Sequence, residues 1–538
     1  MTVLARRQLG VALVVALLGV CTASGVLAAA SAASRTASGS SIVWDLPAGE
    51  PGSIDPALSG TSSSTTPLAN MCEALTTYTA SGKLEPWLAS SWSQPNPKTL
   101  VFTIRSGVSF WDGKPLTAAD VVYSLTRQLN PALGGTWTEP WFADVSSIKQ
   151  TGANKVTVRF NQPDAVFVEI MSTTAGEISE AAYVKAKGKT YGSSSGGLMC
   201  TGPYQFSKWT SGESIVMKTN PGYWNKAASA KIGTVTFDFV TDANTLTNAL
   251  QTGGIDGSYD VPVSSLEQLK TSSAGTLHLS RSVAMEILTF TRKAGPVANA
   301  KVREALTIAI DRAQIAASVY HSAATPVWSI NMPALWSYGA STFEKTYKSL
   351  PGASVQLAQA KALVSAAGAA ASKPMTLLVS SANQTDQEIA TYIQSVASSI
   401  GLHVQIVTTP PGHFVQVLFD PKLLSTYDML LDEGAWDILD PIEALMFVAL
   451  PGSILDTSGF SNPTVTKLIN EARGTTNLAQ RASLLDRATA IYQGQFFGEL
   501  LVANPAERLF LNKHFSGAPT SALGYLYTPW AASLRATP

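Results

Sequence analysis

The sequence predicts an α/β protein with room for two or three compact lobes, and three observations support this. The chain has 538 residues, whereas single hydrophobic cores stop growing at about 250–300 residues. Met375 to Val379 reads as a buried strand, the segment after it carries a helical apolar stripe, and Val404 begins a second strand. This βαβ unit implies a parallel sheet with a right-handed crossover. Residues 98–131 add a further unit in which strand and helix alternate.

That second unit contains the most informative local signals of the chain. Residues 101–105 alternate in polarity with the period of a half-buried strand. The Asp112-Gly113 pair predicts a tight turn. Thr117 stands three residues before Asp120, which is the spacing of a capping box at the start of a helix, expected over 118–129.

Further elements follow from the same patterns. An apolar face from Val302 to Ile310 predicts a helix, and Asp311 with Gln314 is placed to cap the next one. The remaining expected elements are hairpin strands at 204–209 and 214–218, helices near 463–473 and 478–495, and an extended stretch over 500–511.

The charge balance excludes several classes of partner. The chain carries 37 basic and 37 acidic residues, and its formal net charge is zero. A strongly basic surface for nucleic acid or an anionic membrane is therefore not expected. Mean hydropathy is slightly positive at +0.13, but only the N-terminus contains a long uninterrupted apolar run.

The N-terminus has the parts of an export signal. Arg6 and Arg7 precede an apolar core from Leu9 to Val20, and small residues follow from Ala28 to Ala33. We expect a signal sequence over 1–27 and a Ser/Ala-rich tether over 28–41. The core is short for a membrane span, which needs about 20 residues.

Two modes of processing remain open for this export signal. Leu18-Gly19-Val20-Cys21 is similar to a bacterial lipobox, which makes Cys21 a candidate lipidation site, although a small residue is expected where Val20 stands. Cleavage at the Ala-rich segment would instead release a soluble protein. Of the other cysteines, Cys72 and Cys200 are candidates for a disulfide in an oxidising compartment, with two buried free thiols as the alternative.

Five strings spread along the chain together resemble one family. They are GVSFWDGKPLTAADVVYSL at 107–125, PWLASSW at 86–92, TGPY at 201–204 with NPGYW at 220–224, LQTGGID at 250–256, and VREALTIAIDR at 302–312. All are similar to segments of the extracytoplasmic solute-binding proteins that serve ABC importers of peptides and nickel, known as family 5.

The resemblance implies a two-lobed periplasmic-binding-protein (Venus-flytrap) fold with an extra subdomain in the first lobe. It implies capture of a small solute, with di- and oligopeptides as a candidate class, and delivery to an ABC permease driven by a separate ATPase. We expect an extracytoplasmic monomer that is not an enzyme and needs no cofactor or metal. The expected boundaries are lobe I at 42–75, 200–284 and 506–538, the extra subdomain at 76–199, and lobe II at 285–505.

The acidic segment at 428–443 is the candidate ligand site. In peptide-binding relatives an Asp four residues before a Pro pairs with the α-ammonium group of the ligand, and Asp437 with Pro441 matches that spacing. Gly434 and Trp436 depart from the Gly-Trp pair of these relatives, and Trp436 could line the cleft or belong to the core. Asp437 could alternatively cap a turn. The acidic residues of the segment are Asp428, Asp432, Glu433, Asp437, Asp440 and Glu443.

Two further positions are candidate ligand contacts by the same resemblance. Trp328 and Asn331 follow a helix end in lobe II, where relatives place loops that face the ligand. Phe110 and Trp111 adjoin a tight turn, which favours a packing role for both.

An extracytoplasmic serine hydrolase or peptidase is the alternative from another class. It rests on the acidic segment and on a G-x-S-x-G match at 192–196 with Ser194 as nucleophile, but that pattern needs a strand before it and a helix after it. Ser/Gly low complexity there favours a loop. None of the five histidines has metal-binding spacing, so a metal would enter only as a chelate.

Overall fold

The computed structural model describes residues 41–537 apart from 80–81, 134–136, 497 and 522–523. The expected signal sequence, the candidate lipidation site Cys21 and the tether as far as residue 40 lie outside these residues. The fold begins with β1 (Ser41–Asp45), one residue earlier than the sequence indicated. Within the described part of the chain, no helix combines the length and apolarity needed to cross a membrane.

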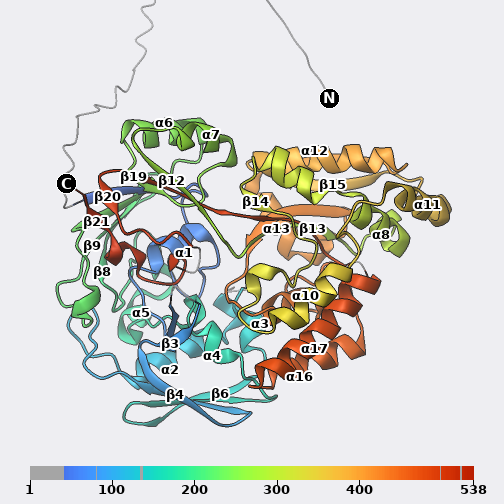
Figure 1. The fold of residues 1–538 in the computed structure, drawn as a ribbon. Helices are drawn as coiled ribbons and strands as arrows, with labels where there is room; N and C mark the ends of the chain where they lie inside the picture. Colours follow the sequence, from blue (N-terminus) through green and yellow to red (C-terminus); the bar gives the residue numbers. More distant parts are fainter. Residues whose placement is uncertain (1–40, 80–81, 134–136, 497, 522–523, 538) are drawn as a thin grey trace, which may run out of the picture. The chain divides into compact units, whose positions relative to one another are not determined.

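The first lobe is built on a seven-stranded mixed sheet in the order β12-β19-β11-β1-β10-β9-β8. β1 pairs in parallel with β10 and β11, and its Ile42 and Trp44 are fully buried. The helices α6 (Ala243–Thr252) and α7 (Leu266–Lys270) lie beside this sheet (Figure 1). The other strands are β8 (Tyr204–Thr210), β9 (Ser214–Thr219), β10 (Thr234–Asp238), β11 (Gly257–Ser258), β12 (Gly275–Ser280) and β19 (Glu507–Asn512).

A separate four-stranded antiparallel sheet follows early in the chain. Its order is β4-β5-β7-β6, with β4 (Ala89–Asn96), β5 (Thr99–Ile104), β6 (Val145–Gly152) and β7 (Lys155–Phe160). The side chains of Val121 and Leu125 in α2 (Ala118–Arg127) are buried in the core beside this sheet. The capping box of Thr117 and Asp120 is present at the start of the helix. The helix ends two residues before the expected 129. Cys72 and Cys200 form a disulfide with their Cα atoms 4.9 Å apart.

The second lobe is built on a six-stranded sheet in the order β14-β18-β13-β17-β15-β16. β15 (Met375–Ser380) and β16 (Val404–Thr409) are parallel, and α12 (Gln384–Ser399) connects them, so the expected βαβ unit is confirmed (Figure 1). α8 (Ala300–Ala309) forms where the apolar face predicted a helix. The other strands are β13 (Ala284–Phe290), β14 (Ala324–Thr325), β17 (Met429–Ala435) and β18 (Leu500–Pro505).

Two segments connect the sheets. The chain leaves the first sheet after β12 and returns between β18 and β19, where Ala506 interrupts the extended stretch expected over 500–511.

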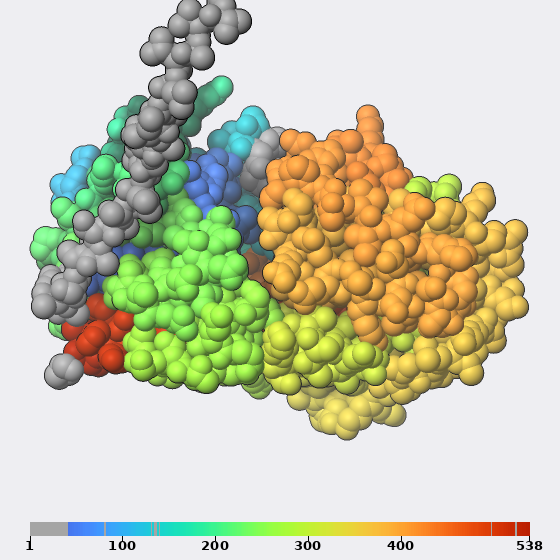
Figure 2. Space-filling model, turned by 90° about the horizontal axis from the view of Figure 1, so that it is seen from above, coloured from blue at the N-terminus to red at the C-terminus, as the bar shows by residue number. Residues whose placement is uncertain are grey.

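α16 (Pro463–Arg473) has the predicted bounds, whereas α17 (Leu478–Ile491) ends early and continues as a π-helix over 492–496. Figure 2 shows the green atoms of the α6 and α7 region beside the orange and yellow atoms of the second lobe.

Candidate functional site

Asp437 lies where the two lobes meet. It follows β17 of the second lobe, and only 6% of its surface is exposed. The indole Nε1–H of Trp137, in the first lobe, donates to Asp437 Oδ2 at 2.6 Å. The hydroxyl of Tyr527, from the C-terminal segment of the first lobe, donates to Asp437 Oδ1. One carboxylate of the second lobe is therefore held by two aromatic residues of the first.

Glu443 fixes the turn that presents Asp437. It belongs to α15 (Ile442–Ala449) and is fully buried. Its Oε2 accepts the backbone N–H groups of Asp437 at 2.8 Å and of Ile438 at 3.0 Å. Burial, and after it the neighbouring charge of Asp437, raises the pKa of Glu443 well above its ordinary value. Glu443 thus serves as a hydrogen-bond acceptor that orients the main chain.

An aromatic cluster surrounds Phe447 beside this turn. Trp137, Trp141 and Trp436 place their ring centroids 5.3, 5.8 and 6.3 Å from that of Phe447. Trp436 is fully buried, so it is part of the core, and it packs in the same cluster as the tryptophan that binds Asp437. Such apolar walls exclude water and strengthen the polar contacts of the carboxylate.

The charge state of Asp437 reflects two opposing influences. Burial raises the pKa of Asp437 above its ordinary value, and the hydrogen bonds from Tyr527 and Trp137 oppose that rise because they stabilise the anion. The pKa of Tyr527 is raised well above its usual range by burial and by the charge of Asp437. The phenol therefore stays protonated and acts as a donor.

The family model for bacterial extracellular solute-binding proteins, family 5 Middle, matches residues 83–453. The chain belongs to this family. It is the extracytoplasmic solute-binding component of an ABC importer, and family members work with a membrane permease. The hydrolase alternative has no support.

Relatives cover most of this solute-binding protein. It is 25% identical over 445 residues to the periplasmic murein peptide-binding protein MppA of Escherichia coli (strain K12), which covers 79% of this chain and 80% of the relative. Among solved structures, AgaA in complex with agropinic acid, from A. tumefacien R10, has a TM-score of 0.81 at 22% identity, covering 93% of this chain and 99% of that one. DppA of Helicobacter pylori in complex with the peptide STSA has a TM-score of 0.80 at 20% identity, covering 92% and 98%.

Three other acids of the 428–443 segment form ion pairs of their own in this solute-binding protein. Lys293 Nζ lies 2.7 Å from Asp428 Oδ2, and Arg481 Nη1 lies 2.7 Å from Asp440 Oδ2. Arg508 Nη2 lies 3.5 Å from Glu433 Oε1. The acids of this segment therefore have different partners. Glu433 and Asp437 both contact first-lobe residues, and Asp437 is the one held by two aromatic donors of that lobe.

The remaining candidate residues make internal contacts. Gly434 lies in β17 opposite Met285 of β13. Trp328 donates through its indole to the carbonyl of Tyr347 at 2.7 Å and stacks on that ring. Asn331 is buried and accepts a hydrogen bond from the Trp336 indole at 2.7 Å. None of these pairings and hydrogen bonds involves Asp437.

The G-x-S-x-G match has the geometry of a loop. Residues 191–196 form turns and a bend that follow a short 3-10 helix over Gly188–Thr190, and no strand leads into them. The strand-turn-helix that a nucleophile elbow requires is absent at Ser194. In the described part of the chain, no group of three or more His, Cys, Asp or Glu side chains could hold a metal ion.

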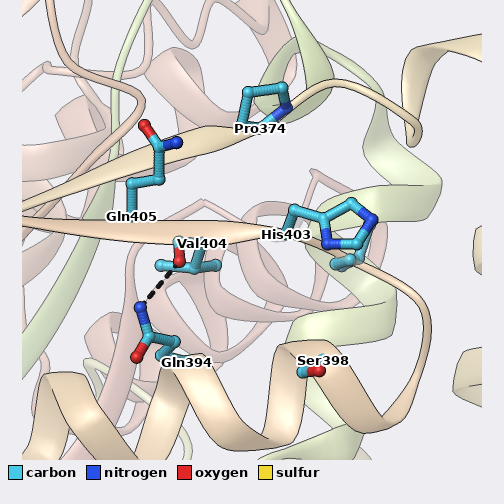
Figure 3. Close-up of a pocket in the computed structure, with 7 residues that line it drawn as sticks. Pro374, Gln394, Ser398, His403, Val404 and Gln405 are labelled. Carbon is cyan, nitrogen blue, oxygen red and sulfur yellow. Dashed lines mark hydrogen bonds between the residues drawn. The ribbon is translucent and has the colours of Figure 1, made fainter.

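Two surface hollows lie on other parts of the molecule. One of about 490 Å³ is formed at the edge of the second sheet by α12 and β16, where Gln394 donates to the carbonyl of Val404 (Figure 3). Another of about 890 Å³ lies between the loop at Gln162–Pro163 and α16. Neither is lined by Asp437, Glu443 or Trp137.

Sequence reasoning missed the first-lobe half of the site. Trp137 and Tyr527 had no local motif to mark them, because only the fold brings them to Asp437. Glu443 was recognised only as a member of the acidic segment, although its position six residues after Asp437 fits a main-chain contact.

Proposed function

We propose that this protein captures a small solute bearing an ammonium group, with di- and oligopeptides as the class, and that Asp437 binds that group. The observation that carries the proposal is the buried Asp437 carboxylate, which accepts hydrogen bonds from Trp137 and Tyr527 of the first lobe. A cation bound there would be sealed when the lobes close, by the hinge motion of periplasmic binding proteins.

The carboxylate retains capacity for a ligand. A carboxylate offers about four acceptor positions, and the Trp137 and Tyr527 donors occupy one on each oxygen. An ammonium donor would add a charge-assisted hydrogen bond, which is about twice as strong as a neutral one. Similarity to MppA and to the peptide complex of DppA supports a peptide-like solute.

The remaining parts of the proposal concern organisation and delivery. We take lobe I as 42–75, 200–284 and 506–538, the extra subdomain as 76–199, and lobe II as 285–505. The closed monomer presents both lobes to the permease. The N-terminal segment exports the chain, which is then either anchored through Cys21 or released after cleavage at the Ala-rich site.

The proposal is tested in two steps. Native mass spectrometry of the purified protein identifies any solute that co-purifies. Calorimetry with Ala-Ala-Ala and its N-acetylated form then tests the ammonium: the free peptide binds and acetylation weakens it about 10- to 100-fold, as expected for a charged hydrogen bond of about 1.5–3 kcal/mol. We expect Asp437→Asn to lower the affinity for the free peptide to a similar degree. Equal affinity for the two peptides would exclude the ammonium contact.

A further inference from the structure

Arg473 joins the two lobes by direct contacts. It is the last residue of α16 in the second lobe, and only 5% of its surface is exposed. Its Nη2 lies 2.7 Å from Asp164 Oδ2 and its Nη1 lies 2.8 Å from Asp144 Oδ2. Nη2 also donates to the carbonyl of Trp141 at 3.2 Å, and the carbonyl of Arg473 accepts the N–H of Ala165 at 2.7 Å. All these partners belong to the first lobe, so each contact crosses from one lobe to the other.

The chain itself passes between the lobes in another region. It crosses after β12 and again between β18 and β19. Figure 1 shows β19 and β14, the partner of β18, in its upper half, whereas α16 and β6 lie near the lower edge. A contact far from the connection between two bodies restrains their hinge opening more than one beside it, because its lever arm is longer. The hollow of about 890 Å³ between residues 162–163 and α16 adjoins this contact, so water reaches the boundary of the lobes there.

The first lobe holds its half of the contact in place without Arg473. Asp164 Oδ1 accepts the backbone N–H groups of Val166 and Phe167, both at 2.9 Å. This carboxylate is therefore oriented by its own segment and leaves Oδ2 for the guanidinium. The side chain of Asp144 is 28% exposed, so it is already partly hydrated. The acids thus form a receptor for an arginine that arrives and leaves with the second lobe.

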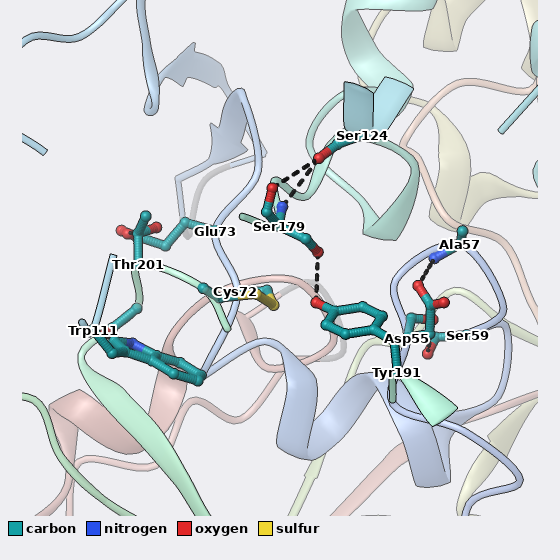
Figure 4. The surroundings of a disulfide bond; sticks show 12 residues. Asp55, Ala57, Ser59, Cys72, Glu73, Trp111, Ser124, Ser179, Tyr191 and Thr201 are labelled. Carbon is teal, nitrogen blue, oxygen red and sulfur yellow. Dashed lines mark hydrogen bonds between the residues drawn. A yellow bond between two sulfur atoms is a disulfide. The ribbon is translucent and has the colours of Figure 1, made fainter. Parts of the chain in front are cut away.

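The four-stranded sheet that receives this contact is fixed to the rest of the first lobe. The disulfide of Cys72 and Cys200 closes the segment that contains this sheet. Arg127 of α2 forms a buried ion pair with Asp55, and its Nη1 donates to Asp55 Oδ1 at 2.8 Å. The N–H of Trp111 donates to the carbonyl of Cys200 at 3.2 Å. Figure 4 shows Asp55 and Trp111 among the residues around the disulfide. A contact with this sheet therefore acts on the first lobe as a whole.

Arg481 of α17 provides a comparison within the second lobe. It also reaches the first lobe, at Glu169 Oε1 3.1 Å away, but it pairs with Asp440 of its own lobe at 2.7 Å. Arg481 therefore keeps a counter-ion when the lobes separate. Both ion pairs of Arg473 are with first-lobe acids, so separation of the lobes breaks them together.

The segment that accepts Arg473 also reaches the candidate site. Trp137 stands two residues before α3 (Glu139–Phe142), and Trp141 lies within that helix. The indole of Trp137 donates to Asp437, and the carbonyl of Trp141 accepts the guanidinium of Arg473. One short segment of the first lobe therefore carries both contacts, and the closure that makes one of them also makes the other.

We propose that Arg473 is a positioning residue for solute binding, which holds the lobes closed and thereby sets the rate at which the solute leaves. It acts through lobe closure rather than through contact with the solute. A guanidinium bound to two carboxylates makes strong charge-assisted hydrogen bonds. Capture takes place in the open form, in which these bonds are absent, so the contact slows release rather than capture. The inference rests on the proposed function only in its choice of a peptide as the solute.

Small-angle X-ray scattering of the full chain tests the contact without any solute. Arg473→Met removes both ion pairs, and its radius of gyration should exceed that of the unaltered protein because the lobes open more often. Lys293→Met is the control: it also leaves a buried acid without its cation, but Lys293 and Asp428 both belong to the second lobe. Its radius of gyration should stay unchanged. Equal radii for Arg473→Met and the unaltered protein overturn the inference.

Stopped-flow tryptophan fluorescence with Ala-Ala-Ala then separates release from capture. Arg473→Met should raise the dissociation rate constant about 10- to 100-fold, as expected for the loss of a charged hydrogen bond. The association rate constant should stay within about threefold. Arg473→Lys keeps the positive charge without the planar fork, and it should recover part of the loss. A change confined to the association rate constant overturns the inference.

Asp144→Asn covers the case in which Arg473→Met fails to fold. It removes one ion pair from the first-lobe side, at a half-buried position, and should change the radius of gyration and the dissociation rate constant in the same direction by a smaller factor. If it lowers thermal stability alone, the contact is merely structural and the inference is overturned. Failure of the unaltered protein to bind Ala-Ala-Ala contradicts the proposed function, and the scattering comparison still decides this inference.

Discussion

Trp137 and Asp437 are 300 positions apart, and the indole N–H of one donates to the carboxylate of the other at 2.6 Å. The contact joins a loop of the first lobe to the end of a strand in the second. A donor in this position stabilises the Asp437 anion and also favours the closed arrangement of the lobes. If Asp437 binds the ammonium group of the solute as proposed, both effects favour that binding, and this contact couples lobe closure to the charge state of Asp437.

Replacing Trp137 by Phe tests that coupling. Trp137→Phe retains a ring to pack on Phe447 but removes the N–H, and we expect the affinity for Ala-Ala-Ala to fall about 10- to 100-fold, since a hydrogen bond to a charged group contributes about 1.5–3 kcal/mol. Isothermal calorimetry measures the change. Trp87→Phe is the matched control: its indole donates to Glu73, inside the first lobe. An unchanged affinity in Trp137→Phe would show that this contact does not contribute to binding.

How much the sequence could predict depends on whether a feature is local. The capping box at Thr117, the βαβ unit from Met375 and the helix from Pro463 were predicted because turn chemistry and periodicity are properties of neighbouring residues. The helix expected over 478–495 was predicted too long, because α17 ends at Ile491. The switch to a π-helix at Tyr492 leaves the apolar periodicity of the sequence unchanged, so the pattern does not reveal it.

The same distinction between local and long-range features applies to the candidate site. Asp437 was a candidate because its spacing to Pro441 is local, whereas its partners Trp137 and Tyr527 lie in distant segments that only the fold brings together. Trp328 and Asn331 were candidates because they follow a helix end at which relatives place loops that face the ligand. The sequence could not show that their polar atoms are already hydrogen-bonded within the second lobe.

Glu443 should act as a positioning residue. Glu443→Ala removes the acceptor of two backbone N–H groups, so we expect the affinity for Ala-Ala-Ala to fall about tenfold as the turn that carries Asp437 loosens. Glu443→Gln keeps a carbonyl acceptor at the same position, and it should restore most of the affinity. If Gln were as damaging as Ala, the carboxylate itself would be needed and the positioning role would be wrong.

Glu177 should lower stability at high pH. Its pKa is raised by burial from 4.5 to about 8, so the folded state binds more protons than the unfolded state between these values, and stability falls as pH rises through that window. Glu177→Gln removes this dependence. We expect the variant to match the unaltered protein near pH 4 and to be about 1–3 kcal/mol more stable at pH 8, measured by urea denaturation. A variant that is less stable at pH 8 would contradict this account.

The Cys72–Cys200 disulfide should contribute substantially to stability. It closes a loop of 128 residues, and cross-links of long loops restrict the unfolded chain most. The double variant Cys72→Ala, Cys200→Ala should unfold with a free energy about 2–5 kcal/mol lower. A reduced but otherwise unaltered protein provides the control, and it should show the same loss of stability.

Arg481 should be essential to the packing of α17 against the first lobe. It is 2% exposed and pairs with Asp440 at 2.7 Å and with Glu169 at 3.1 Å. Arg481→Met leaves the buried Asp440 and the half-buried Glu169 without a cation, so we expect a loss of about 3–5 kcal/mol in the free energy of unfolding at pH 8.

The loss should shrink as pH falls toward 5. Burial and then the charge of Asp440 already raise the pKa of Glu169 to about 7, while Arg481 opposes the rise. Without the arginine, Glu169 holds its proton in the folded state to still higher pH, and its protonation relieves the repulsion from Asp440. Arg487→Met, on the exposed side of the same helix, is the control and should change stability by less than about 0.5 kcal/mol. A loss independent of pH would mean that Arg481 stabilises the helix by packing alone.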